Sequence, residues 1–429
     1  MASAVHRTIE ALWRIESASI IATVARMTGD VGIAEDLVQE AFVTAIERWS
    51  QSGLPEKPGA WLMTAAKHRA IDLIRRNKLL DEKHQELGQR LLDEQQFAVA
   101  DFSDTFASQM DAPIEDDLLR LIFIACHPVL STEAQTALTL RLLGGLSTQE
   151  IAHAFLVPEA TIAQRIVRAK RTLAAANVPF ELPHTSQLAP RLSAVLRVLY
   201  LIFNEGYAAT SGEDWIRPSL CEEALRLGRI LAELLPGESE VHGLVALMEL
   251  QASRMRARVG PTGQPILLME QDRARWDHLL VQRGLARLER AASLGNAFGP
   301  YSIQAAIAAC HARARLPEET DWQQIAALYD ALAQILPSPV VELNRAVAVA
   351  MAFGPAAGLE IVDDLMQERS LANYHLLPSV RGDLLAKLGR LPEARIEFER
   401  AATMTQNQRE QQLLLARAAE CGKREETEG

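Results

Sequence analysis

The stretch from residue 146 to 173 constrains the chain most, because it predicts two short helices joined by a tight turn. Ser147 followed by Glu150 is the pattern of a capping box, in which a hydroxyl and a carboxylate satisfy backbone donors at a helix start. We expect a helix over 148–155. Pro158 then marks a break, because the residue before a proline is pushed out of α geometry and proline suits the first turn of a new helix.

The second predicted helix, 159–173, has an apolar face and a polar, basic face. Its large aliphatic residues recur at spacings of three and four, which is typical of a helix with one buried side. The opposite face carries five candidate DNA-binding residues: Thr161, Gln164, Arg165, Arg168 and Arg171. Arginine and glutamine can read base edges in the major groove, and further cations can bind phosphates. A helical hairpin with a solvated basic face would give the same pattern.

The net charge of the chain argues against nucleic acid, but the distribution of charge does not. The 429 residues sum to −11 at pH 7. Residues 81–118 hold 2 Lys/Arg against 11 Asp/Glu, whereas residues 119–175 hold 6 against 3. The acidity therefore lies outside the candidate DNA-binding helices. A hydrophobic content of 48% can fill the cores of several domains.

Several function classes find no support in the sequence. The four cysteines lie far apart with no histidine at a ligand spacing, so we expect reduced thiols, no metal site and no cofactor. We see no Gly-rich phosphate loop or nucleophile–base pattern, and we therefore expect no enzyme. No leader and no long apolar run is evident, which predicts a cytoplasmic protein.

The first 80 residues predict three helices. One covers 6–28, a second begins after Gly32, and a third covers 60–76 behind a polar loop. The second helix is expected to turn an acidic and polar face to solvent, made of Glu35, Asp36, Gln39, Glu40 and Glu47. Between 117 and 144 we expect two more helices, 118–125 and 133–143, the latter capped by Ser131.

Two parts of the chain resemble a known family. Residues 36–42 (DLVQEAF), 60–62 (AWL) and 70–76 (AIDLIRR) resemble region 2 of extracytoplasmic-function sigma factors. Residues 147–173 resemble region 4 of the same factors, which holds their helix-turn-helix. The resemblance implies an all-α fold, with region 2 over 1–80, an acidic linker over 81–114, and region 4 over 115–178.

The resemblance also assigns roles to residues. The 159–173 helix would read the −35 element of a promoter. Residues on the acidic face would bind core RNA polymerase: Asp36, Gln39, Glu40 and Phe42. Residues of the third helix would bind the −10 element: Trp61, Lys67, His68, Arg69, Arg75 and Arg76. A solvated helix face and a core position for Trp61 are the alternatives.

Residues 186–429 predict a further helical domain. Small and large residues fit one tetratricopeptide frame at Gly382, Leu385, Gly389, Ala394, Phe398 and Ala401. The period breaks around 260–265 and 295–300. Together, residues 199–207 (LYLIFNEGY), 321–322 (DW) and 337–348 resemble the tetratricopeptide-like extension of one subgroup of these sigma factors. Such a stack suits a regulatory protein or ligand.

The sequence thus predicts a promoter-specific initiation factor regulated by its own carboxy-terminal domain. Its partners would be core RNA polymerase and promoter DNA, with no membrane partner. The alternative is a helix-turn-helix repressor or activator that acts without polymerase and has a helical sensing domain.

Overall fold

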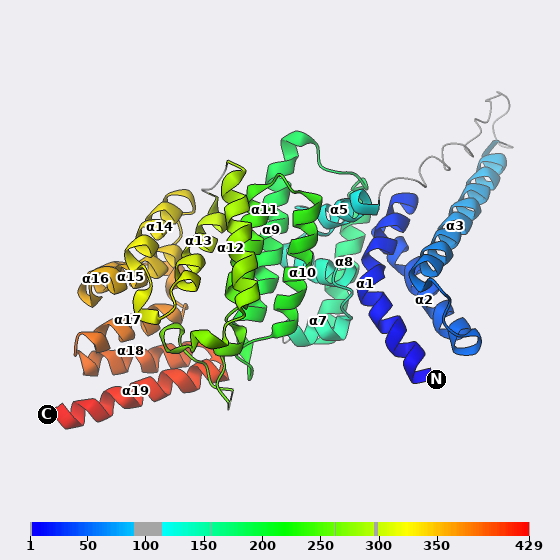
Figure 1. Cartoon of the computed structure of the whole chain (residues 1–429). Coiled ribbons are helices and arrows are strands. Elements are labelled where there is room, and N and C mark those ends of the chain that lie inside the picture. The colour runs from blue at the N-terminus through cyan, green and yellow to red at the C-terminus, as the bar shows by residue number, and fades with distance from the viewer. Residues whose placement is uncertain (1, 90–113, 156, 262, 296–298, 429) are drawn as a thin grey trace. The chain divides into compact units, whose positions relative to one another are not determined.

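The computed structural model describes residues 2–89, 114–155, 157–261, 263–295 and 299–428, and it confirms an all-α fold. The chain forms two compact units, Met1–Val198 and Leu199–Gly429, here called unit 1 and unit 2 (Figure 1). The division lies inside the helix α9 (Thr185–Tyr207) instead of in the proline-containing segment before residue 186. No helix in the described ranges is both long and apolar enough to cross a bilayer.

Unit 1 holds the two segments that resemble sigma regions. Its helices are α1 (Ala2–Thr28), α2 (Val31–Ser52), α3 (Pro58–Gln89), α5 (Ile114–Ala125), α6 (Thr132–Leu142), α7 (Thr148–Phe155), α8 (Glu159–Ala175) and the first part of α9 (Thr185–Tyr207). The predicted helices are all present, with bounds shifted by a few residues. The exception is α3, which continues well beyond Arg76 into the predicted linker. The linker residues 90–113 lie outside the described residues.

Helix α1 is the centre of unit 1. Ile20, Ile21 and Val24 are fully or almost fully buried, because α1 packs against α2, α3 and α5. Asp30 caps α2, and its carboxylate accepts hydrogen bonds from the amides of Gly32 and Ile33 at 2.6 and 3.0 Å. Local signals thus begin the helices, and burial of α1 holds them together.

Unit 2 is a succession of helices, most of which pack on the next in sequence (Figure 1). They are α10 (Pro218–Leu234), α11 (Ser239–Ala252), α12 (His278–Ser293), α13 (Pro300–Arg313), α14 (Trp322–Ile335), α15 (Pro339–Phe353), α16 (Pro355–Leu365), α17 (Leu376–Lys387), α18 (Leu391–Met404) and α19 (Gln408–Glu428). Two short strands, β1 (Ser211–Gly212) and β2 (Gln406–Asn407), pair in parallel.

The predicted repeat positions near residue 390 form a real helix pair. Leu385, Ala394 and Phe398 are almost fully buried between α17 and α18. A Cβ at Gly382 would lie only 3.0 Å from the ring of Phe398, so this position needs the smallest residue. Gly389, with φ +76°, makes the turn between the helices.

The sequence pattern changes around 260–265, and the structure also changes there. Between α11 and α12 the described residues form 3-10 turns and an isolated bridge of Val259 to Pro265. Arg258 is 7% exposed there and lies over the ring of Tyr207 at 3.5 Å. Arg273, also buried, donates to the carbonyls of His311 and Ala314. Buried arginines thus hold a segment whose described residues form no α-helix.

Candidate functional site

The helix pair α7–α8 has the predicted capping box. The amide of Ser147 donates to Oε2 of Glu150 at 2.7 Å, and the amide of Glu150 donates to the Ser147 hydroxyl at 3.1 Å. Partial burial raises the pKa of Glu150, but the hydrogen bonds from Ser147 and the charge of Arg14 outweigh it and lower that pKa overall. In the turn, Leu156 lies outside the described residues, and Pro158 precedes α8 as expected.

The buried side of α8 fixes its orientation on unit 1. Ile162, Ile166, Ala169 and Leu173 are 0–6% exposed. Thr161, Gln164, Arg168 and Arg171 are exposed, and Arg165 is half-buried. The five predicted DNA-binding residues therefore lie on the accessible side of the helix, opposite its core contacts.

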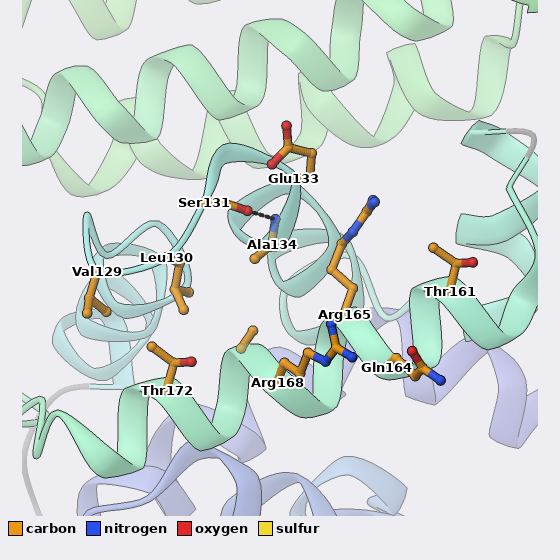
Figure 2. A pocket seen from close by; sticks show the side chains of 11 residues that line it. Val129, Leu130, Ser131, Glu133, Ala134, Thr161, Gln164, Arg165, Arg168 and Thr172 are labelled. Carbon is orange, nitrogen blue, oxygen red and sulfur yellow. Dashed lines mark hydrogen bonds between the residues drawn. The ribbon is translucent and has the colours of Figure 1, made fainter.

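Four of these five residues line one shallow groove. A space of about 420 Å³ lies between α8 and the segment that begins α6, and Thr161, Gln164, Arg165 and Arg168 line it. Figure 2 shows Thr161 and Arg165 projecting from the side of α8 that faces the Ser131–Ala134 segment. Arg171 is exposed beside the groove but does not line it.

One carboxylate faces this basic groove. Glu133 lines it in the first turn of α6. Its own backbone amide and the Ser131 hydroxyl lower the pKa of Glu133, and the charge of Arg165 lowers it further. Because Glu133 is ionised at neutral pH, its charge would repel a phosphate at this end of the groove.

A cluster of three charged residues, which the sequence did not predict, holds the inner side of α8. Lys170 contacts Oε2 of Glu35 at 2.5 Å, and Arg141 of α6 contacts Oε1 of the same carboxylate at 2.6 Å. Glu35 is 1% exposed. The expectation that Glu35 belongs to the solvent face of α2 is therefore wrong, since region 4 covers it.

Further contacts join the same two segments. Trp13 of α1 donates its indole N–H to the carbonyl of Gly145 at 2.9 Å. Asp117 of α5, fully buried, pairs with Arg26 of α1 at 2.9 Å. The predicted regions 2 and 4 thus form one compact unit.

The predicted polymerase-binding residues of α2 divide into surface and core. Asp36 and Glu40 are exposed. Gln39 is half-buried and donates to Oε1 of Glu35 at 2.7 Å. Phe42 is 5% exposed and packs edge-on against Trp13, with ring centroids 4.9 Å apart. Phe42 therefore supports α2 from inside and offers no surface for a partner.

The predicted −10 residues of α3 are also of two kinds. His68, Arg75 and Arg76 are exposed, and Lys67 is half-buried. Trp61 is half-buried and packs edge-on against the buried Trp49 at 5.3 Å, so one part of its ring is core and another is accessible.

Arg69 is half-buried, and its guanidinium contacts α2. It donates to the Thr44 hydroxyl at 2.6 Å and lies 3.5 Å from Oε2 of Glu40. It therefore ties the predicted −10 helix to the predicted polymerase-binding face.

Comparison with known families decides what these two segments are. Residues 13–79 match the family described as Sigma-70 region 2, and residues 120–173 match Sigma-70, region 4. The chain belongs to the sigma-70 family. It is a sigma factor, and the two matched regions imply that it binds core RNA polymerase and promoter DNA.

The relatives of this sigma factor cover different shares of it. An uncharacterized protein, R00370, of Rhizobium meliloti (strain 1021) is 44% identical over 378 residues, which are 88% of this chain and 87% of that protein. A probable ECF RNA polymerase sigma factor, SigI, of Mycobacterium tuberculosis is 27% identical over 168 residues, 39% of this chain and 55% of SigI. Residues 191–292 match a family of unknown function, DUF6596.

Proposed function

We propose that this sigma factor is of the extracytoplasmic-function type and directs promoter-specific initiation. In this proposal α8 reads the −35 element, α3 and the loop before it bind the −10 element, and exposed acids of α2 bind core polymerase. The chain would act in the cytoplasm and carry out no catalytic chemistry of its own, because the polymerase makes the RNA.

The accessible face of α8 is the observation that carries the proposal. Gln164, Arg165 and Arg168 point away from the core, and side chains of this kind make paired hydrogen bonds with base edges. Their own helix is anchored from behind by its aliphatic residues and by Lys170. A reading helix held in this way loses little freedom when it binds DNA.

Two exposed acids of α2 support the proposed contact with polymerase. Asp36 and Glu40 share one side of the helix, because residues four apart are neighbours on a helix surface. Both are exposed in a unit whose other nearby acid, Glu35, is buried and paired. A basic partner surface could therefore reach both carboxylates.

We also propose that unit 2 is tetratricopeptide-like and regulates initiation. Its helices stack on their neighbours in sequence, and the α17–α18 pair has the small and large residues of that repeat. Stacked helix pairs offer extended surfaces for a regulatory partner or ligand.

The direct test is transcription with purified core polymerase and a promoter library. The full chain should yield transcripts from a restricted set of promoters. Changing Arg165→Ala and Arg168→Ala together should weaken initiation at those promoters by a factor of about thirty or more, since each lost base contact is worth roughly 1–3 kcal/mol.

Two controls give this test its meaning. The double variant should still bind core polymerase, and Arg48→Ala, which removes an exposed arginine of α2, should initiate normally. Tight binding of duplex DNA without polymerase, together with no transcripts, would reject the proposal in favour of a repressor or activator.

A further inference from the structure

An arginine-lined groove crosses the first helices of unit 2. It is made by side chains of α10, α11 and α12, and its volume is about 590 Å³. The lining residues are Arg229, His242, Glu249, Arg283, Ala286, Arg287 and Arg290. Grooves of this size are typical of sites for small molecules. All seven residues fall inside the segment that matches the family of unknown function.

The groove has an excess of positive charge. Arg283, Arg287 and Arg290 are spaced so that they share one face of α12. None of the three forms an ion pair with a carboxylate in the described part of the chain. Arginines placed together in this way repel one another, and a bound anion would offset that repulsion.

The packing of α12 on α11 determines which lining residues lie at each end of the groove. Ser239 of α11 donates to the carbonyl of Ala291, and Arg287 lies 3.5 Å from Nδ1 of His242. At the other end, a Cβ on Gly284 would touch Leu250. The helices are therefore antiparallel, with His242 beside Arg287 at one end and Glu249 near the start of α12 at the other. Seven residues of α-helix separate these ends by about 10 Å.

The His242 end is the more electropositive. Burial lowers the pKa of His242, and the charges of Arg287 and Arg290 lower it further, although a hydrogen bond with the carbonyl of Pro236 opposes this. His242 is therefore neutral at pH 7. The two arginines provide the charge at this end, where they can reach the oxygens of a phosphate.

At the opposite end of the groove, one carboxylate oxygen of Glu249 accepts no hydrogen bond. Glu249 is 1% exposed, and its Oε1 accepts a hydrogen bond from Nε of Arg229 at 2.9 Å and forms an ion pair with the same guanidinium at 2.8 Å. Its Oε2 is buried and accepts none. A buried carboxylate oxygen without a partner costs free energy, so a ligand that donates a hydrogen bond here would gain affinity.

We propose that this groove binds a small phosphorylated molecule, with its phosphate against Arg287 and Arg290 and a hydroxyl or amine donating to Glu249. The lining contains no Phe, Tyr or Trp, so the site recognises phosphate and polar hydrogens and does not stack on a base. Sugar phosphates and nucleotides share this chemistry.

Isothermal titration of the full chain tests the proposal without polymerase. The probes are inorganic pyrophosphate, fructose 1,6-bisphosphate, ADP, citrate and a short acidic peptide. Binding of a phosphorylated probe supports the proposal. If fructose 1,6-bisphosphate binds more tightly than ADP, the ligand is a sugar phosphate; if ADP binds more tightly, it is a nucleotide. The proposal is overturned if no phosphorylated probe binds. It is also overturned if citrate binds as tightly as the phosphorylated probes, or if the peptide is the only probe that binds.

Variants connect the binding to the groove. Changing Arg287→Ala and Arg290→Ala together should weaken all phosphorylated probes at least tenfold. Arg369→Ala, which removes an exposed arginine of η5 (Arg369–Leu371) outside the groove, should change nothing. Equal affinity in the groove variant and the wild type would place the ligand elsewhere and reject the site.

A second variant tests the acceptor. Glu249→Gln should weaken a hydroxyl-bearing probe but not pyrophosphate, which has no such donor to offer. Retained pyrophosphate binding also shows that this variant is folded, and an equal effect on both probes would contradict the role of Glu249. Any effect of the bound probe on transcription rests on the proposed function, whereas the binding itself does not.

Discussion

At the scale of single residues, Glu35 links the two sigma regions. Its carboxylate contacts Arg141 and Lys170, and both cations are themselves four-fifths buried. We expect Glu35→Ala to lower the free energy of unfolding of unit 1 by about 3 kcal/mol, because it leaves two buried charges without a partner. Chemical denaturation of the full chain, followed by tryptophan fluorescence, measures this.

The neighbouring residue provides the control. Asp36 is exposed on the same helix turn, so Asp36→Ala should change the unfolding free energy by no more than about 0.5 kcal/mol. Equal effects of the two substitutions would mean that the cluster around Glu35 contributes no specific stability.

At the scale of elements, α2 has a core side and a solvent-exposed side. Its inner side packs Phe42 against Trp13, and its outer side exposes Asp36 and Glu40. Charge reversal by Asp36→Lys with Glu40→Lys should weaken association with core polymerase at least tenfold, a loss of roughly 1.4 kcal/mol. Fluorescence anisotropy with labelled sigma factor measures it.

The reversal should leave the fold intact. Glu40 is about two-thirds exposed, and its contact with Arg69 is a surface pair of small energetic value. Glu10→Lys, an exposed reversal on α1, should bind polymerase as the wild type does. Wild-type association of the double variant would remove the polymerase-binding role from these two acids.

At the scale of the whole molecule, a contact in unit 2 joins the loop after α9 to β2, the strand just before α19. Asn407 is 1% exposed and donates its side-chain amide to the carbonyls of Ala209 and Asp214 at 3.0 and 2.9 Å. Next to it, β1 pairs with β2. This contact ties together two segments that lie far apart in the sequence.

Loss of the contact should loosen both segments together. Asn407→Ala leaves two carbonyls without a donor, so unit 2 should lose about 2 kcal/mol. Hydrogen exchange should show faster exchange in peptides around 209–215 and 405–410. Thr403→Ala, an exposed change on α18, should not alter these peptides; unchanged exchange in the Asn407 variant would show that the contact does not couple them.

Local signals allowed much of unit 1 to be predicted. The capping box at Ser147, the break at Pro158 and the cap at Ser131 lie where the structure has helix ends, because these interactions involve residues only a few positions apart. The exposed face of α8 also followed from its period. The end of α3 did not, since no proline or glycine stops it near Arg76.

The sequence by itself thus determined the helices, the two sigma regions and the accessible basic face of α8, all of which depend on short-range spacing. Only the tertiary structure decided that Glu35 is buried while Asp36 is not, and that Arg69 contacts Glu40. It alone brought the arginines of α10 and α12 into one groove across α11. The physical reason is that the burial and partners of a charged side chain depend on residues distant in sequence, which a helical period does not specify.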